Sequence, residues 1–357
     1  MDNYLLDGHK LFWHMDRILA WQQNRMIPPI YVEISPVSYC NHRCIFCGTD
    51  FAMQKAVQLD TEILCKRLKE MASLGVRSIM YAGEGEPLLH SDLSALVNVS
   101  KSIGIDVAIT TNGALGTEPL WKEILPPLSW VKFSVDAGSP SVYSRVHQVP
   151  EKAFDKTLDS IDKAIKVKKD HSLNVTLGVQ FLLIEENVDD LENAVQLFSQ
   201  SDIDYLVIKP YSLHPQMIKE KEVSYSEETV RNVQEVVDRY QGKTNVNLIF
   251  RKGTMEKYIQ REKHYHHCYA LPFWGYLSSR GDFYTCSVFL GEERLKAGNI
   301  YERSTHDILM GGDRRKAIEF GEKDLNIGEV CRLNCRMARI NEFLEYLEKR
   351  PEHVNFI

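Results

Sequence analysis

The sequence lacks a long apolar run. No stretch reaches the roughly 18 consecutive apolar residues that indicate a membrane-spanning helix. The first residues, MDNYLLDGHKLFWHMDRILAW, hold acids and histidines where a secretory signal would start basic and continue apolar. We therefore expect a cytoplasmic protein with no membrane contact.

An excess of positive charge is also absent. The formal net charge is -6, and no run of five or six like charges occurs. A nucleic-acid surface needs a basic patch, so we expect no nucleic-acid partner. The 357 residues, 44% of them hydrophobic, are enough to bury a large core in one or two domains. Without a secretion signal, the eight cysteines favour metal or cofactor binding over disulfides.

Three of these cysteines, Cys40, Cys44 and Cys47, lie within the string YCNHRCIFCG. A 4Fe-4S cluster normally has four cysteine ligands, so a cluster bound here would keep one iron open to an outside ligand. Zinc is the alternative, with His42 as the fourth ligand, because structural zinc sites are closed by a fourth Cys or His. Covalent haem attachment is excluded, since Gly48 and not a histidine follows Cys47.

The Cys-x3-Cys-x2-Cys spacing, with Phe46 just before the last cysteine, resembles the cluster motif of the radical S-adenosylmethionine (radical SAM) enzymes. The resemblance implies that SAM chelates the open iron through its amino and carboxylate groups. One electron from the cluster then splits SAM into methionine and a 5'-deoxyadenosyl radical, which abstracts a hydrogen atom from the substrate. It also implies anaerobic chemistry and a reducing partner such as flavodoxin or ferredoxin.

Strands and helices alternate along the chain, which predicts an α/β fold with a parallel sheet. The expected strands are 30–35, 77–82, 106–110, 130–135, 174–182 and 204–208, and the clearest helix is 60–75. Six such units resemble the partial, open (βα)6 TIM-like barrel of the radical SAM enzymes, with active-site groups on the loops after the strands. We expect an N-terminal helical extension (1–28), this barrel (29–250), an auxiliary-cluster domain (251–340) and a C-terminal helix and tail (341–357).

The loop after the second expected strand is similar to the family's Gly-Gly-Glu-Pro motif. It reads Gly83-Glu84-Gly85-Glu86-Pro87, with Glu84 where the family has glycine. The resemblance implies that this loop contacts the amino group of the SAM methionine, and glycines let the main chain approach a ligand closely. A dinucleotide-binding loop is the rival interpretation, but a third glycine is missing.

Two further loops extend the resemblance. Asn112 lies in a Thr-Asn-Gly turn like that of the family, with an ordinary Asn-Gly turn as the alternative. Ser134 and Asp136 end the fourth expected strand, and Arg145 follows. In relatives this serine contacts the ribose or methionine end of SAM, and an arginine pairs with its carboxylate, for which a guanidinium is well shaped. Ala137 departs from the family pattern and leaves the role of Asp136 open, and a surface position for Arg145 is an equal alternative.

Polar residues near the ends of later strands are candidates for substrate and cofactor contact. Lys209 and Tyr211 follow the sixth expected strand and, with Asp136, are the candidate catalytic residues. Gln180 lies within the fifth strand and is a candidate cofactor contact. A solvated loop position for Lys209 is the alternative, because most lysines are exposed.

Four cysteines lie beyond residue 250. Twelve residues separate Cys268 from Gly281 and four separate Gly281 from Cys286, which resembles the opening of the SPASM and twitch extensions of radical SAM enzymes. Cys331 and Cys335 complete four thiolates, enough for one auxiliary 4Fe-4S cluster, the twitch pattern of 2-deoxy-scyllo-inosamine dehydrogenase-type enzymes. Zinc, or ligation by His264, His266 or His267, is the alternative. Cys65 fits a helical apolar pattern as a free cysteine.

These residues led us to expect a radical SAM oxidoreductase. The expected reaction oxidises a sugar or aminocyclitol alcohol to a ketone, with the auxiliary cluster accepting the substrate electron. We favour a small polar substrate because only some thirty residues precede the first expected strand. Modification of a peptide or protein is the second hypothesis. Epimerisation is the third, although it needs a hydrogen donor, and Cys65 is the one cysteine not assigned to a cluster.

Overall fold

One curved sheet organises the molecule. The computed structural model describes residues 4–6, 8–219 and 223–356. Among these residues ten strands form a single sheet in the order β10-β9-β8-β1-β2-β3-β4-β5-β6-β7. Their bounds are β1 Tyr31–Ile34, β2 Ser78–Tyr81, β3 Asp106–Thr111, β4 Leu128–Ser134, β5 Thr176–Leu183, β6 Tyr205–Pro210, β7 Asn247–Phe250, β8 Trp274–Leu277, β9 Asp282–Tyr284 and β10 Lys296–Asn299. Strands β1 to β7 are parallel in chain order, β8 pairs in parallel with β1, and β9 and β10 are antiparallel.

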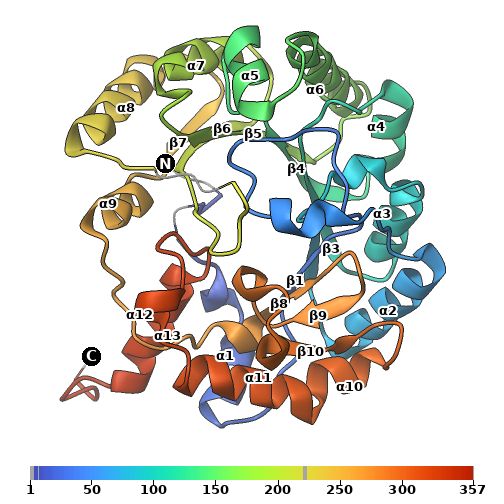
Figure 1. Ribbon diagram of the computed structural model, residues 1–357, viewed down its shortest axis with the longest axis vertical. Helices are drawn as coiled ribbons and strands as arrows, with labels where there is room; N and C mark the ends of the chain where they lie inside the picture. The colour runs from blue at the N-terminus through green and yellow to red at the C-terminus, as the bar shows by residue number, and fades with distance from the viewer. Residues whose placement is uncertain (1–3, 7, 220–222, 357) are drawn as a thin grey trace.

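Helices cover the convex side of the parallel strands, as the outer arc in Figure 1 shows. The arc contains α2 Thr61–Leu74, α3 Leu93–Ser102, α4 Glu118–Ile124, α5 Pro140–His147, α6 Lys152–Asp170, α7 Leu191–Ser199, α8 Glu227–Tyr240 and α9 Lys252–Gln260. The remaining helices are α1 Met15–Gln22, α10 Thr305–Met310, α11 Gly312–Lys323, α12 Ile327–Val330 and α13 Ala338–Lys349. None of the helices in the described part of the chain is both long and apolar enough to cross a bilayer.

Helix α2 shows how the sequence sets these boundaries. Asp60 caps its first turn by accepting the N–H of Ile63 at 2.8 Å, and Gly75 ends it in the left-handed region with φ 103°. Leu64 and Leu68 face inward and are fully buried. An acidic N-cap and a glycine after the last turn both stabilise the ends of a helix, and these two signals predict the helix at 60–75.

The alternation of each strand separates an apolar face from a polar one. On β4, Val131 and Phe133 are fully buried in the core beneath the helices. Trp130, Lys132 and Ser134 lie on the opposite, concave face, because successive side chains of a strand point to opposite sides. The concave face therefore holds the polar groups available for function.

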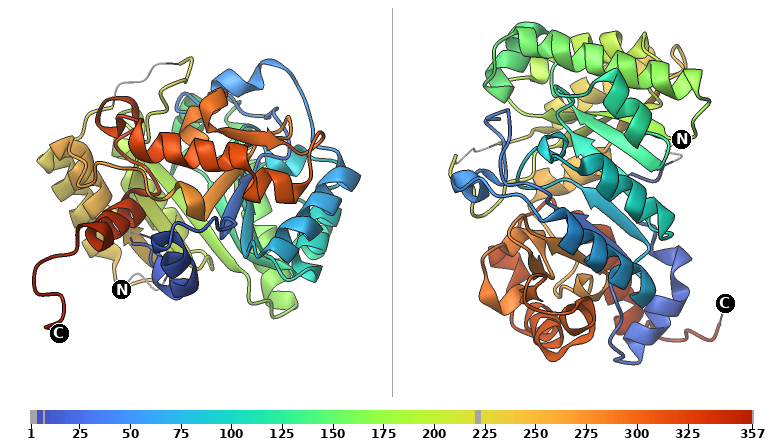
Figure 2. Two further views of the ribbon diagram at one scale, coloured as in Figure 1. Left: turned by 90° about the horizontal axis from the view of Figure 1, so that it is seen from below. Right: turned by 90° about the vertical axis from the view of Figure 1, so that its right-hand side faces the viewer.

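The C-terminal segment continues the sheet. Because β8 pairs with β1, the hairpin of β8 and β9 lies directly beside the first parallel strand, and α10 packs on α2. Both views of Figure 2 show these orange and red elements against the blue N-terminal part. Arg314 of α11 is fully buried and donates to the carbonyls of Ile27, Leu309 and Pro272 at 2.7 to 2.8 Å.

The α/β fold with an open parallel sheet is confirmed, and β10 and β7 are its edges. β7 is a parallel strand beyond the six expected ones. β8 and β9 are the two short strands that residues 275–287 predict on either side of a Ser-Ser-Arg-Gly-Asp turn, and β8 also pairs in parallel with β1. The four-part division of the chain stays a prediction.

Trp21 of α1 packs against Tyr269 and Phe273, whereas Trp13 is 74% exposed.

Candidate active site

The first three cysteines converge on one cavity. Cys40, Cys44 and Cys47 line a space of about 660 Å³ above the carboxyl ends of the strands, in the loop after β1. Hydrogen bonds to the end of α5 hold this loop: the N–H of Arg43 donates to the carbonyl of His147 at 3.0 Å, and that of Ile45 to Val146 at 2.9 Å. The loop is thereby fixed on both sides of the second cysteine, Cys44.

The thiols of this loop are neutral when no metal is bound. Burial raises the pKa of Cys40 to about 12 and also raises the pKa values of Cys44 and Cys47. Because only a thiolate ligates metal, the bound group must supply positive charge and its binding must release protons. His42 is held by a contact of 3.0 Å between its Nε2 and the Tyr143 hydroxyl.

The glycine loop after β2 forms one wall of the cavity. A Cβ on Gly85 would lie 2.4 Å from the carbonyl oxygen of Tyr39 and 2.6 Å from that of Val37. Gly83 has φ 112°, and a Cβ there would lie 2.4 Å from the Tyr276 hydroxyl. Since neither position has room for a side chain, the loop presents main chain to the cavity. This close approach is what a main-chain contact to SAM requires.

Glu86 joins two loops of the site. Its carboxylate accepts the Thr111 hydroxyl at 2.5 Å and the N–H of Asn112 at 2.8 Å, so it connects the loops after β2 and β3. Burial raises its pKa. Asn112 lines the cavity and donates to the Asn41 side chain at 2.8 Å. Pro87 is buried at the start of a short 3-10 helix, Pro87–Leu89.

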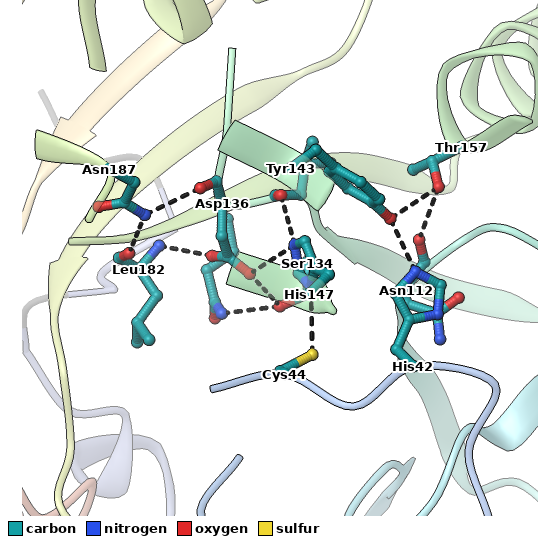
Figure 3. A network of polar contacts seen from close by, with 12 residues as sticks. His42, Cys44, Asn112, Ser134, Asp136, Tyr143, His147, Thr157, Leu182 and Asn187 are labelled. Atoms are coloured by element: carbon teal, nitrogen blue, oxygen red, sulfur yellow. Dashed lines mark hydrogen bonds and ion pairs between the residues drawn. The ribbon is translucent and has the colours of Figure 1, made fainter. Parts of the chain in front are cut away.

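A buried network follows β4 (Figure 3). Asp136 is fully buried with φ 57°, and its carboxylate accepts the N–H of Leu182 at 2.6 Å and the Ser134 hydroxyl at 3.2 Å. Burial raises the pKa of Asp136 to about 7. The Gln180 amide donates to the Ser134 oxygen at 3.1 Å. The network therefore joins β4 to β5 directly below the cysteine loop.

His147 connects that network to the cysteines, and no sequence motif pointed to it. Its Nε2 lies 2.6 Å from the carbonyl of Val135, and its Nδ1 lies 3.1 Å from the Cys44 sulfur. Burial lowers its pKa to about 3, so the free protein holds it neutral. The carbonyl requires a proton on Nε2, which leaves the Nδ1 lone pair facing the Cys44 thiol.

Of the other expected residues, one lines the cysteine cavity and two do not. Phe46 lines the cavity, with its ring 5.4 Å from that of His147. Arg145 is exposed and donates to the Glu186 carbonyl at 2.5 Å. The Tyr211 hydroxyl is buried against the Met217 sulfur at 2.8 Å. Neither Arg145 nor Tyr211 lines the cavity that contains the cysteines.

A second cavity, called here the lumen, occupies the concave face of the sheet. Its volume is about 370 Å³, and it opens to solvent. Gln180 and Lys209 line it, and sequence reasoning missed Lys132, Arg251 and Arg336, which line it too. Ser134 lines the cysteine cavity while its partner Gln180 lines the lumen, so this hydrogen bond is part of a shared wall.

The C-terminal cysteines also converge. Cys268, Cys286, Cys331 and Cys335 line one apolar space with Trp274. Burial raises the pKa of Cys286 to about 12, and a hydrogen bond between Cys331 and Cys335 raises the pKa of the first and lowers that of the second.

The histidines near Cys268 have other partners. His266 contacts the Glu345 carboxylate at 2.8 Å, and His267 contacts the Glu322 carbonyl at 2.9 Å. Cys65 lies half-buried on α2 and lines neither of the two cysteine cavities. Among the described residues, no three Cys, His, Asp or Glu side chains are arranged to hold a single metal ion. A cluster spreads its thiolates further apart than one ion does, so three and four converging thiols suit iron-sulfur groups.

Part of the chain is similar to known proteins. The model of the Radical SAM superfamily matches residues 34–198. A GTP 3',8-cyclase of Chlorobaculum tepidum is 31% identical over 188 residues, 52% of this chain and 55% of the relative. A probable GTP 3',8-cyclase of Sulfurisphaera tokodaii is 28% identical over 204 residues, 57% of this chain and 61% of the relative. The chain thus spans little more than half of the curated relatives it matches.

Solved structures share the fold. SuiB of Streptococcus suis bound to S-adenosylmethionine is 22% identical with a TM-score of 0.64, covering 83% of this chain and 70% of SuiB. Native anSMEcpe with bound AdoMet is 16% identical with a TM-score of 0.61, covering 90% of this chain and 98% of that one. At these identities the likeness establishes the fold alone.

The comparisons correct one prediction. We expected an oxidoreductase that converts a sugar or aminocyclitol alcohol to a ketone, and the curated relatives are instead named GTP 3',8-cyclase. The expectation was wrong because it was drawn from the number of C-terminal cysteines. Four thiolates limit how many clusters the chain holds, but they do not touch substrate and carry no information about its chemistry.

Proposed function

Because residues 34–198 match the Radical SAM superfamily, we propose that Cys40, Cys44 and Cys47 hold a 4Fe-4S cluster whose open iron binds SAM, and that the protein uses it for radical chemistry on a substrate in the lumen. When bound, cluster and SAM supply a 5'-deoxyadenosyl radical that abstracts hydrogen. The observation that carries the proposal is the pairing of three thiols, and no fourth, with a glycine loop that exposes main chain to the same cavity.

The residues of the chain itself would bind SAM and the substrate and orient them. The main chain at Gly83 and Gly85 leaves room for the methionine end of SAM. Glu86 holds this loop in place by accepting the N–H of Asn112 at 2.8 Å. Ser134 and Gln180 separate the two cavities by one hydrogen bond of 3.1 Å, so a group in the lumen lies one side chain away from the SAM cavity.

We infer further that Cys268, Cys286, Cys331 and Cys335 hold a second 4Fe-4S cluster of the twitch type, since all four line one apolar space. A small reducing protein such as flavodoxin or ferredoxin would supply the electron. GTP is the first substrate to assay, because the curated relatives are named for it. A precursor peptide, which SuiB is described as binding, is the second.

Iron analysis and SAM cleavage test the proposal together. Anaerobically reconstituted protein is expected to hold about eight irons, and the triple variant Cys40→Ala, Cys44→Ala, Cys47→Ala about four, since each cluster has four. Only the wild type should form 5'-deoxyadenosine after reduction with dithionite. Equal iron in both proteins, or 5'-deoxyadenosine from the variant, would disprove the assignment of the first cluster.

The substrate assay is read separately. Consumption of GTP with 5'-deoxyadenosine formation would extend the relatives' named activity to this chain. SAM cleavage without loss of GTP would confine the likeness to the SAM-binding half.

A further inference from the structure

The lumen concentrates positive charge. Five cationic side chains line it, and no carboxylate among the described residues does: Lys10, Lys132, Lys209, Arg251 and Arg336. They come from the N-terminal segment, β4, β6, the end of β7 and the residue after Cys335. The fold therefore gathers cations from five separate parts of the chain onto one surface, in a protein whose net charge is -6.

Two carboxylates lie near this surface, and among the described residues neither forms an ion pair with Lys132 or Lys209. Glu33 accepts a hydrogen bond from Arg336, which also donates to the Tyr31 hydroxyl at 3.1 Å. Asp136 is turned toward β5, where it accepts the N–H of Leu182 at 2.6 Å. In the described part of the chain, no carboxylate lies within ion-pair distance of Lys132.

The cations lower the pKa values of the two lysines. Burial lowers the pKa of Lys132 to about 8, with Arg336 and Arg251 adding to the effect. Burial, Lys132 and Arg251 lower the pKa of Lys209. A lysine without a carboxylate partner is rarely buried in a protein interior, because desolvation disfavours its charged form. An anion at this position would remove both the repulsion and the desolvation penalty.

Aromatic surface lies beside the charge. Trp130 neighbours Lys132 on β4, with the ammonium 5.9 Å from the indole centroid, and Tyr31 and Tyr205 complete the same wall. Such a surface suits a planar ring, while the ammonium and guanidinium groups suit oxyanions. The volume of about 370 Å³ is near the lower end of small-molecule pockets.

We propose that the lumen binds a small substrate through its oxyanion groups, phosphate or carboxylate, which Lys132, Lys209 and Arg251 hold while Trp130 packs against the rest of the molecule. This inference rests on the proposed function for the statement that the bound molecule is the substrate. The recognition of the anion itself rests only on the charges, burial and volume of the lumen.

Calorimetric titration of the reconstituted, SAM-loaded protein tests the proposal, with inorganic pyrophosphate, citrate and GTP as probes. Lys132→Met and Lys209→Met should each weaken binding about 10- to 100-fold, the range for loss of one charge-assisted hydrogen bond. Lys132→Arg, which restores the charge, should bind nearly as the wild type does. Lys101→Met is the matched control, because Lys101 lies exposed on α3 and pairs with Asp106 at 3.1 Å.

The outcomes separate the two proposals. Binding of pyrophosphate but not citrate assigns phosphate as the recognised group, and the reverse assigns carboxylate. No binding of any probe to the wild type, or equal binding by Lys132→Met and Lys101→Met, overturns the anion site even if SAM is cleaved. Absence of 5'-deoxyadenosine from the wild type overturns the proposed function and leaves the titration valid, since pyrophosphate binding needs no radical.

Discussion

Replacing Gly85 with alanine tests the main-chain wall of the SAM cavity most directly. A Cβ at this position would lie 2.4 Å from the Tyr39 carbonyl oxygen, 2.6 Å from the Val37 carbonyl oxygen and 2.8 Å from the Tyr39 nitrogen. Ordinary contact begins at 3.4 Å, so the nearest pair is 1.0 Å too close (3.4 minus 2.4). All three neighbours are backbone atoms, which cannot rotate away as a side chain can, so the loop itself must move.

A shift of this size sets the expected effect. Displacement of a positioning element by about 1 Å can reduce a rate about 100-fold, and overpacking a tight site costs about 1–3 kcal/mol. We therefore expect Gly85→Ala to lower the rate of 5'-deoxyadenosine formation about 100-fold. Because Tyr39 directly precedes Cys40, iron content is measured beside the rate, which separates a shift of the glycine loop from a shift of the cysteine loop.

Gly312→Ala is the control for this variant. Gly312 begins α11, and no atom lies within 4 Å of the Cβ that alanine would add. Thermal unfolding and SAM-cleavage rates of the two variants would be compared after the same reconstitution. A Gly85→Ala protein that cleaves SAM at the wild-type rate would refute the main-chain wall. A loss of iron would place the defect in the cysteine loop instead.

Three further variants test contacts that hold the site together. Glu84→Ala removes the acceptor of the Ser279 hydroxyl and should lower the free energy of unfolding by about 1–3 kcal/mol in urea titrations; an unchanged midpoint would contradict this contact. Arg336→Met leaves Glu33 without its partner, and the loss should stay below the about 3–5 kcal/mol of a fully buried pair, because the Arg336 side chain is 38% exposed; Glu33→Gln added to it should recover part of the stability. Burial raises the pKa of Asp136 from 3.8 to about 7, so the folded protein keeps a proton that the unfolded chain releases, and stability should fall as pH rises through that window relative to Asp136→Asn; a difference between the two proteins that does not change from pH 4.5 to 7.5 would contradict this assignment.

Much of the fold could be predicted from local signals. The six expected strands each overlap a strand of the sheet, because long β-branched runs between helical segments have few alternatives. Helix 60–75 was predictable to within a residue at each end, since its acidic cap and terminal glycine are both encoded locally. β7 was not predicted, although it is as long as β1 and β2, and residues 275–287 predict β8 and β9 only as a short hairpin. The pairing of β8 with β1 joins positions 243 residues apart, such as Tyr31 and Trp274, and no local pattern encodes such a contact.

The residues of the candidate site also divide into those that the sequence identifies and those that it does not. Cys40, Gly85 and Asn112 were found because their spacing in sequence is itself the signal, and the structure brings them to one cavity. Lys132 and Arg336 were missed because a single cation in a strand or loop looks the same whether it faces solvent or a lumen. Their role becomes visible only when strands far apart in sequence place them on one surface.

Glu84 shows why a departure from a family pattern is informative. The family's glycine would leave this position without a side chain, but here the carboxylate is buried and accepts both the hydroxyl and, at 3.4 Å, the N–H of Ser279 in the turn between β8 and β9. The loop expected to contact SAM is thus fastened to the C-terminal hairpin. Arg336, next to Cys335, is fastened in turn to Glu33 on β1.

These two contacts connect the second cysteine set to the same sheet as the first. The Glu84 contact joins the SAM-side loop to the hairpin, the Arg336 contact joins the second set to the lumen, and β8 covers the edge of β1 between them. A chain ending before β8 would expose the backbone edge of β1 and release both links at once. It follows that the C-terminal segment contributes Arg336 to the wall of the lumen, and that its cysteines lie at a fixed separation from that cavity.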